Sequence, residues 1–198
     1  MELYIIRHGQ TVWNAGKRLQ GRRDIELNAY GRQLAGELGE KLENVPFDCI
    51  YASPLIRAYE TACLIRGHRN IPIIRDGRLR EMSFGVMEGT RVEEWLAEDC
   101  PYRFFFDEPE RYVPPEDGES IDEVMARTSE FLQKVIEPQY KTATRLMIVA
   151  HGALNKGLMC RIEGNDKAHF WGKGLQKNCE ADIFYYDGMS WHAGPELI

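Results

Sequence analysis

Four short apolar runs divide the chain, and each is followed directly by glycine or proline. Continuous apolar runs of this length, bounded by turn residues, are typical of strands buried on both faces, as in parallel sheets. The fourth run leads into an Asp-Gly turn and the segment MSWHA, which predicts a terminal hairpin. The predicted strands are residues 2–8, 48–53, 145–151 and 181–187.

Segments with helical periodicity lie between these runs. Asn28 is a good N-cap, and Ser120 with Glu123 forms a capping-box pattern, in a helix that we expect to end before Pro138. The four predicted helices begin at Asn28, Pro54, Ser120 and Gly152. Strands that alternate with helices predict an α/β fold, here a three-layer α/β/α sandwich with a mostly parallel central sheet.

The segment 82–115 does not follow this alternation. It is rich in aromatic residues and proline, with three consecutive phenylalanines at 104–106. We interpret it as a small helical insertion that covers the active site like a lid. The alternative is a satellite hydrophobic cluster that only packs. No repeat or linker divides the rest, so we expect one domain over residues 1–198.

Composition narrows the class of protein. A chain of 198 residues with 43% hydrophobic residues can build one substantial core. A net charge of -6 without a long basic run disfavours nucleic acid or an anionic membrane as partner. The first strand begins at once, and we see neither a signal peptide nor a membrane-length apolar run, so we expect a cytoplasmic protein. Five scattered cysteines, without a CxxC pair, argue against a disulfide framework or a zinc site.

Basic residues gather where three predicted strands end. Arg7 and His8 end the first run, and His151 ends the third. Arg57 follows the second run by one helical turn. Because ligands bind at the carboxyl ends of strands in open α/β sheets, we expect two imidazoles and two guanidiniums to share one crevice.

Each of these residues also has a plain structural interpretation. Arg57 could be solvated or paired with Glu60, and either histidine could belong to the core or the surface. However, a cation in the first turn of a helix opposes the helix dipole, and a nearby anion would remove that conflict. His8 and His151 share the order apolar run, histidine, glycine, and the glycine permits close approach of a ligand. Together the four residues favour an anion site.

Two histidines with two arginines suit phosphoryl chemistry. Guanidinium groups match the oxygens of a phosphate, and a neutral imidazole can attack phosphorus to give a phosphohistidine. Flanking cations disfavour imidazolium, which would keep His8 nucleophilic. The candidate acid that protonates the leaving oxygen is Glu81, in LREMSFGVMEG; its alternative is an ordinary exposed carboxylate.

Seven sequence blocks occur in an order that points to one family. They are RHGQTVWN, LQGRRDIELNAYGRQLA, IYASPLIRAYETA, LREMSFGVMEG, DGESIDEVMAR, MIVAHGALNKGL and KNCEADIFYYDG. Over nearly its whole length the chain resembles the histidine phosphatase superfamily, in its phosphoglycerate-mutase-like branch, as a histidine acid phosphatase-type phosphatase. The resemblance implies an α/β/α sandwich that requires no metal and no cofactor.

The resemblance also implies roles for individual residues. His8 takes the position of the phosphorylated nucleophile, Glu81 that of the proton donor, and His151 that of the second catalytic histidine. The substrate-binding positions of the phosphate pocket fall on Arg7, Arg57, Asn14 and the backbone N–H of Gly152.

We therefore expect a metal-independent phosphatase that hydrolyses a phosphomonoester through a phosphohistidine on His8. Its substrate would be a small phosphorylated metabolite and its product inorganic phosphate, with the protein a monomer or homodimer. The chain lacks the extra insertion that mutases of this branch carry after the acid region, which favours hydrolysis. The alternatives are a phosphoglycerate mutase-type phosphotransferase, a non-catalytic phospho-ligand-binding module, and a metallohydrolase with His8, His151 and Glu81 as ligands.

Substrate choice is less well defined by the sequence. The aromatic segment around 102–106 is the expected selector of the leaving group. Arg22 and Arg23 are candidates for binding a second anionic group, and their alternative is a pair of solvated loop arginines.

Overall fold

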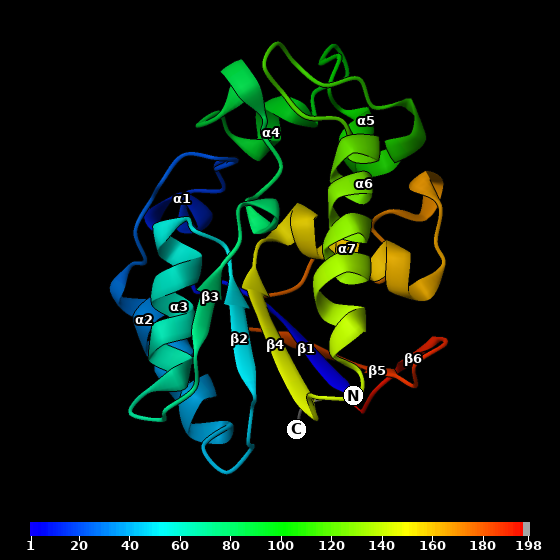
Figure 1. Ribbon diagram of the computed structural model, residues 1–198. Helices are drawn as coiled ribbons and strands as arrows, with labels where there is room; N and C mark the ends of the chain where they lie inside the picture. Colours follow the sequence, from blue (N-terminus) through cyan, green and yellow to red (C-terminus); the bar gives the residue numbers. More distant parts are fainter. Residues whose placement is uncertain (196–198) are drawn as a thin grey trace.

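A six-stranded sheet forms the middle layer of the protein (Figure 1). The computed structural model describes residues 1–195, and residues 196–198 of the predicted domain lie outside the described residues. The strand order is β3-β2-β4-β1-β5-β6; the first four of these are parallel, and β5 and β6 are antiparallel to their neighbours. The strands are β1 (Glu2–Arg7), β2 (Cys49–Ala52), β3 (Ile73–Arg75), β4 (Arg145–Ala150), β5 (Ala181–Tyr186) and β6 (Trp191–Ala193).

Helices cover both faces of the sheet (Figure 1). Helices α2 (Ala29–Lys41) and α3 (Ile56–Arg66) lie on one face, and α6 (Ile121–Phe131) and α7 (Gly152–Glu163) on the other. Alternate residues of β1 enter the two cores: Leu3 packs on the α6 and α7 side, and Tyr4 on the α2 and α3 side. The predicted three-layer α/β/α fold with a mostly parallel sheet is confirmed.

The predicted helix starts agree with the structure to within two residues. The side chain of Asn28 accepts a hydrogen bond from the Gly31 N–H (2.7 Å), and Ser120 and Glu123 form the reciprocal capping box of α6. Instead of ending before Pro138, α6 continues into a π-helical turn, η4 (Leu132–Ile136), and a 3-10 turn, η5 (Glu137–Gln139). A proline in the first turn of a new helical segment loses no hydrogen bond, so the helical backbone continues through Pro138.

Strand β3 was not predicted. It is a three-residue edge strand whose last two residues are exposed, so it lacks the continuous apolar run that marks the central strands.

The segment 82–115 lies above the carboxyl ends of the parallel strands (Figure 1). It contains α4 (Val92–Trp95), α5 (Phe104–Asp107), η2 (Gly85–Met87) and η3 (Pro109–Arg111). Trp95 and Phe105 are almost completely buried, in a cluster that also includes Val124 of α6. The segment therefore has a small core of its own that is joined to α6. The remaining short elements are α1 (Val12–Ala15), η1 (Gly77–Leu79) and η6 (Lys167–His169).

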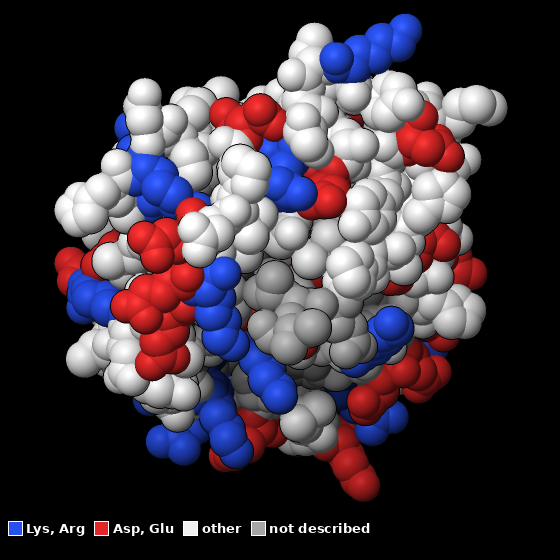
Figure 2. Space-filling model, turned by 90° about the horizontal axis from the view of Figure 1, so that it is seen from below, with Lys and Arg blue, Asp and Glu red and all other residues white. Residues whose placement is uncertain are grey.

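The opposite end of the molecule carries charges of both signs. Figure 2 shows this face from below, with Lys and Arg side chains lying beside Asp and Glu side chains. None of the helices among residues 1–195 is long and apolar enough to span a bilayer.

Two glycines bring the start of α2 against the loop that follows His8. A Cβ atom on Gly9 would lie 2.5 Å from the Gly31 carbonyl oxygen, and one on Gly31 would lie 2.1 Å from the Gln10 carbonyl oxygen. Both distances are far below van der Waals contact, so only glycine fits at these two positions without a shift of the backbone.

We expect Gly31→Ala to lower the free energy of unfolding by about 1–3 kcal/mol, because the new methyl group clashes with main-chain atoms. Gly36 lies in the same helix with no heavy atom within 4 Å of its Cβ position. Gly36→Ala is the matched control and should stabilise by about 0.5–1 kcal/mol. Urea unfolding measures both, and equal stability of the two variants would contradict the close contact.

Candidate active site

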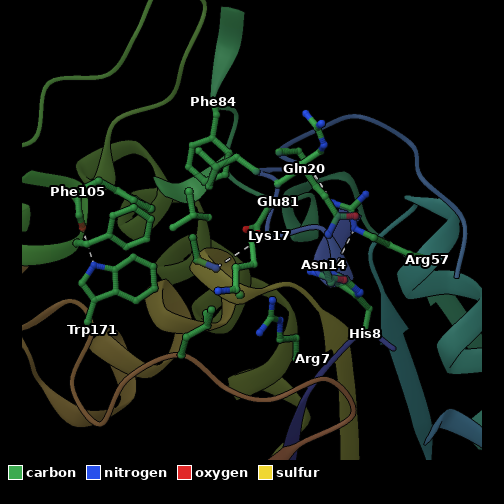
Figure 3. Close-up of a pocket in the computed structure, with 18 residues that line it drawn as sticks. Arg7, His8, Asn14, Lys17, Gln20, Arg57, Glu81, Phe84, Phe105 and Trp171 are labelled. Atoms are coloured by element: carbon green, nitrogen blue, oxygen red, sulfur yellow. Dashed lines mark hydrogen bonds between the residues drawn. The ribbon is translucent and has the colours of Figure 1, made fainter. Parts of the chain in front are cut away.

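A cavity of about 240 Å³ opens at the carboxyl ends of the strands (Figure 3). One part of its lining is polar and the other is apolar. Within the polar part we call six residues the phosphate cup: Arg7, His8, Asn14, Arg57, Glu81 and Gly152. The polar residues around the cup are Lys17, Arg18 and Gln20. His151 lies behind the cup, with its ring centroid 5.1 Å from that of His8. All seven residues predicted for the site therefore lie together, although they are widely separated in the sequence.

His8 is buried at the end of β1 in a defined tautomer. Its Nδ1 lies 2.6 Å from the Gly9 carbonyl oxygen, and because a carbonyl only accepts, Nδ1 carries the proton. Nε2 therefore keeps its lone pair, toward which Arg57 Nε donates at 3.3 Å. Burial, followed by the charges of Arg57 and Arg7, holds the pKa of His8 well below 6.5. The ring is neutral at neutral pH, and its unprotonated Nε2 accepts a hydrogen bond from Arg57 at the cavity.

Arg57 is fully buried in the first turn of α3. Its Nη1 donates to the Arg23 carbonyl and its Nη2 to the Gly21 carbonyl, both at 2.7 Å. Glu60, the alternative ion-pair partner, instead binds Arg32 at 2.6 Å. Burial lowers the pKa of Arg57 to about 10, so the group stays charged at neutral pH. Main-chain oxygens fix this guanidinium without neutralising it.

Arg7 is the second cation of the cup, and it is partly buried. Its Nη1 donates to the Gln176 carbonyl, whereas its buried Nε has no partner among the described residues. The Cβ position of Gly152 lies 3.7 Å from this Nε, which places it at the cavity wall. A buried donor without a partner costs about 1–3 kcal/mol, and an anion in the cup would supply the partner.

His151 follows β4 and precedes α7. It is fully buried, and its Nε2 lies 2.8 Å from the Ser53 hydroxyl. Burial, followed by the charge of Arg57, lowers the pKa of His151 well below 6.5. Ser53 directly follows β2, so this hydrogen bond joins the ends of β2 and β4 beneath the cup.

Glu81 is buried rather than exposed, and the first turn of α7 holds its carboxylate. Oε1 accepts hydrogen bonds from the N–H groups of Met82 and Leu154 (both 2.9 Å), and Oε2 accepts one from Ala153 (3.3 Å). The positive end of the helix dipole favours this position. Oε2 lies 3.7 Å from the Cβ position of Gly152, and so faces the same space as Arg7.

Asn14 and Gly152 complete the cup. The Oδ1 of Asn14 accepts hydrogen bonds from the N–H and hydroxyl of Thr11 (3.0 and 3.1 Å), so its Nδ2 is the atom that can donate to a ligand. Gly152 is the first residue of α7, and a Cβ there would lie 2.7 Å from Leu175 Cδ1. The glycine keeps this part of the cavity open.

Arg22 and Arg23 do not line the cavity. Arg22 lies 3.4 Å from Glu119, and Arg23 lies 3.5 Å from Glu88, so carboxylates already occupy both arginines. The cations that reach the cavity in their place are Lys17 and Arg18. Sequence analysis missed them because no periodic pattern shows that their loop folds over the cup.

Two further supports of the cup were also missed. Arg127 Nη1 donates to the carbonyls of Arg78 and Arg80 (2.6 and 2.8 Å), which fixes the segment leading into Glu81. The Gln176 side chain donates to the carbonyl of Ile5 at 3.0 Å and so fixes the loop whose carbonyl binds Arg7. Both are single polar residues whose partners are distant main-chain atoms, for which the sequence gives no signal.

A family model described as the histidine phosphatase superfamily (branch 1) matches residues 3–194. The chain belongs to this superfamily. The resemblance found from the motifs is confirmed, as is the prediction of a phosphatase-type enzyme.

The names of the relatives of this histidine phosphatase are of two kinds, phosphatase and mutase. Phosphoserine phosphatase 1 of Hydrogenobacter thermophilus is 32% identical over 176 residues, which cover 88% of this chain and 82% of that protein. A probable phosphoglycerate mutase, GpmB of Klebsiella pneumoniae, is 30% identical and covers 100% of this chain and 91% of its own. The solved structure of YhfR of Bacillus stearothermophilus has a TM-score of 0.88 and 36% identity, covering 97% of this chain and 94% of that one.

The described part of the chain has no cluster of side chains that could bind a metal ion. Within residues 1–195, no group of three or more His, Cys, Asp or Glu side chains is arranged to hold a metal ion. The five cysteines are free thiols, and Cys49 and Cys160 are buried.

The buried histidines should make the stability of this histidine phosphatase depend on pH. In the unfolded chain each takes up a proton near pH 6.5, whereas in the folded protein both stay neutral to much lower pH. The unfolded state then binds more protons, so the free energy of unfolding should fall as the pH drops below 6.5, by up to about 1.4 kcal/mol per pH unit for each histidine.

Urea unfolding between pH 7.5 and 5 measures this slope. His8→Asn should make it shallower, and replacement of the exposed His68 by Asn is the control that should leave it unchanged. A slope that His8→Asn does not alter would show that native His8 takes up a proton as readily as the unfolded chain does.

Proposed function

We propose that the protein is a metal-independent phosphatase that hydrolyses a small phosphomonoester through a phosphohistidine on His8. The observation that carries this proposal is the neutral, buried His8, whose unprotonated Nε2 accepts a hydrogen bond from a charged Arg57 that forms no ion pair among the described residues. Membership of the histidine phosphatase superfamily and the relative named phosphoserine phosphatase support it.

The phosphate cup supplies the binding step. Arg7 Nε and the Arg57 guanidinium bring two fixed positive charges, and the N–H of Gly152 at the start of α7 is a further donor for a phosphate oxygen. Asn14 Nδ2 adds a neutral donor. These groups face the equatorial oxygens, where negative charge is spread in the transition state of phosphoryl transfer.

The first chemical step transfers the phosphoryl group to the enzyme. The lone pair of His8 Nε2 attacks phosphorus and forms a P–N bond while the P–O bond to the leaving group breaks. Glu81 enters this step as the carboxylic acid and gives its proton to the leaving oxygen, so the product departs as a neutral alcohol. The carboxylate formed in this way is the species that the N–H groups of Ala153 and Leu154 hold. His151, neutral and hydrogen-bonded to Ser53, supports the wall of the cup behind the transferred group.

The second step regenerates the enzyme. Water attacks the phosphohistidine, Glu81 takes a proton from that water, and the P–N bond breaks to restore His8 and release inorganic phosphate. If a second hydroxyl group took the place of water, the same site would act as a mutase, and the relative named probable phosphoglycerate mutase makes this the second candidate. Incubation with 3-phosphoglycerate separates the two, since a phosphatase releases phosphate and a mutase forms the isomer.

We expect His8→Ala to abolish turnover and labelling, because no other neutral imidazole nitrogen lines the cup. Rapid quenching with a 32P-labelled ester should trap a phosphoenzyme that is labile in acid and stable in base, and chelators should leave its formation unchanged. His169→Ala, which removes an exposed histidine, is the control. Full activity of the His8→Ala variant, or loss of activity with EDTA, would contradict the mechanism.

Glu81→Gln should slow the enzyme according to the leaving group. For an alkyl phosphate, whose alcohol needs a proton on departure, we expect kcat/KM, which reports the steps up to cleavage of the P–O bond, to fall by roughly 10²–10⁴-fold. For p-nitrophenyl phosphate, whose phenolate leaves readily, the loss should be much smaller. Glu110→Gln, an exposed change in the same region of the fold, is the control. An equal loss for both esters would assign Glu81 to positioning instead of proton transfer.

A further inference from the structure

The part of the cavity beyond the phosphate cup is apolar and largely aromatic (Figure 3). We call it the aromatic wall, and it consists of Leu19, Phe84, Val92, Phe105, Phe106 and Trp171. The wall shares one continuous cavity with the cup, so the group attached to a bound phosphate would lie against it.

The aromatic wall is fixed by contacts between two distant segments. Trp171 Nε1 donates to the Phe105 carbonyl at 2.6 Å, and the Trp171 ring lies nearly parallel to that of Phe106, at 18° with centroids 6.0 Å apart. Phe105 is buried beneath them, whereas Phe106 and Trp171 are only partly buried. Two flat apolar side chains therefore remain open to the cavity in a preformed arrangement.

The cavity offers little to a second charged group. Lys17 and Arg18 line it, but both are exposed to solvent, and Arg18 already donates to the Gly89 carbonyl at 2.6 Å. The other cations among the described lining residues are Arg57, which is fully buried, and Arg7, which is partly buried, and the phosphate itself would occupy both. A carboxylate on the leaving group would lie against apolar rings, where it would lose hydration without gaining hydrogen bonds from the rings.

We propose that this enzyme acts on phosphate monoesters of alcohols that carry an uncharged aromatic group, and that Phe106 and Trp171 bind this group. The inference rests on the proposed phosphatase function and names its substrate class. Burial of one aromatic ring against such side chains corresponds to on the order of 10- to 100-fold in binding.

Three esters test the proposal: benzyl phosphate, glycerol 3-phosphate and 3-phosphoglycerate. Each releases a primary alcohol, so the three leaving groups depart with similar ease. The esters therefore differ mainly in the group attached to the phosphate. Wild-type kcat/KM should be about 10- to 100-fold higher for benzyl phosphate than for the other two.

The variant Phe106→Ala should remove at least about tenfold of this preference by lowering kcat/KM for benzyl phosphate only. Phe104→Ala is the matched control, since Phe104 does not line the cavity and lies against the Arg111 guanidinium, 3.8 Å from its ring centroid. It should change none of the three values.

Equal or faster turnover of 3-phosphoglycerate by the wild type would overturn the proposal, as would an equal loss for all three esters in Phe106→Ala. If no ester is hydrolysed, the proposed phosphatase function fails instead. Calorimetric binding then decides the substrate class separately: benzyl phosphate bound at least tenfold more tightly than 3-phosphoglycerate supports it, and equal binding refutes it.

Discussion

Two guanidinium groups without an ion-pair partner within residues 1–195, one fully and one partly buried, are the constraint on which this site depends. Among the described residues, neither Arg7 nor Arg57 forms an ion pair within 4.0 Å, and main-chain carbonyls hold both. A carbonyl fixes a guanidinium in place without forming an ion pair, and carboxylates such as Glu81 act on both groups only from a longer distance. The resulting positive field has two effects at once: it attracts an anion, and it adds to burial in holding the pKa of the adjacent His8 ring low. Anion binding and nucleophilicity are therefore two results of the same arrangement.

The position of these residues at the ends of parallel strands explains why most of the site could be predicted from the sequence. Parallel strands have their carboxyl ends at one edge of a sheet, so residues that end separate apolar runs had to meet there, and Arg7, His8 and His151 do. Arg57 was predictable for the same reason, because it follows β2 by one helical turn. The order of the motifs then assigned Glu81, whose burial against the start of α7 the residues alone did not reveal.

The rest of the site depends on tertiary contacts that leave no periodic signal. Trp171 and Phe105 are 66 residues apart and meet through one side chain and one carbonyl group. Lys17 and Arg18 reach the cavity because their loop pairs with the segment around Gly89, through contacts such as that of the Leu19 N–H with the Thr90 carbonyl (3.0 Å). Strand β3 was missed because an exposed edge strand needs no apolar run. In each case the decisive contacts join segments that are distant in the sequence.

The phosphate cup and the aromatic wall are built from different parts of the chain. Most groups of the cup lie at strand ends and helix starts that the sheet fixes, whereas the rings of the wall come from the segment 82–115 and from the turn that follows η6. Substitutions in the aromatic wall therefore leave the groups of the phosphate cup in place. A duplicated gene with this architecture could drift to a new metabolite by exchanging a few ring-bearing side chains and would remain a competent catalyst at every step of that divergence.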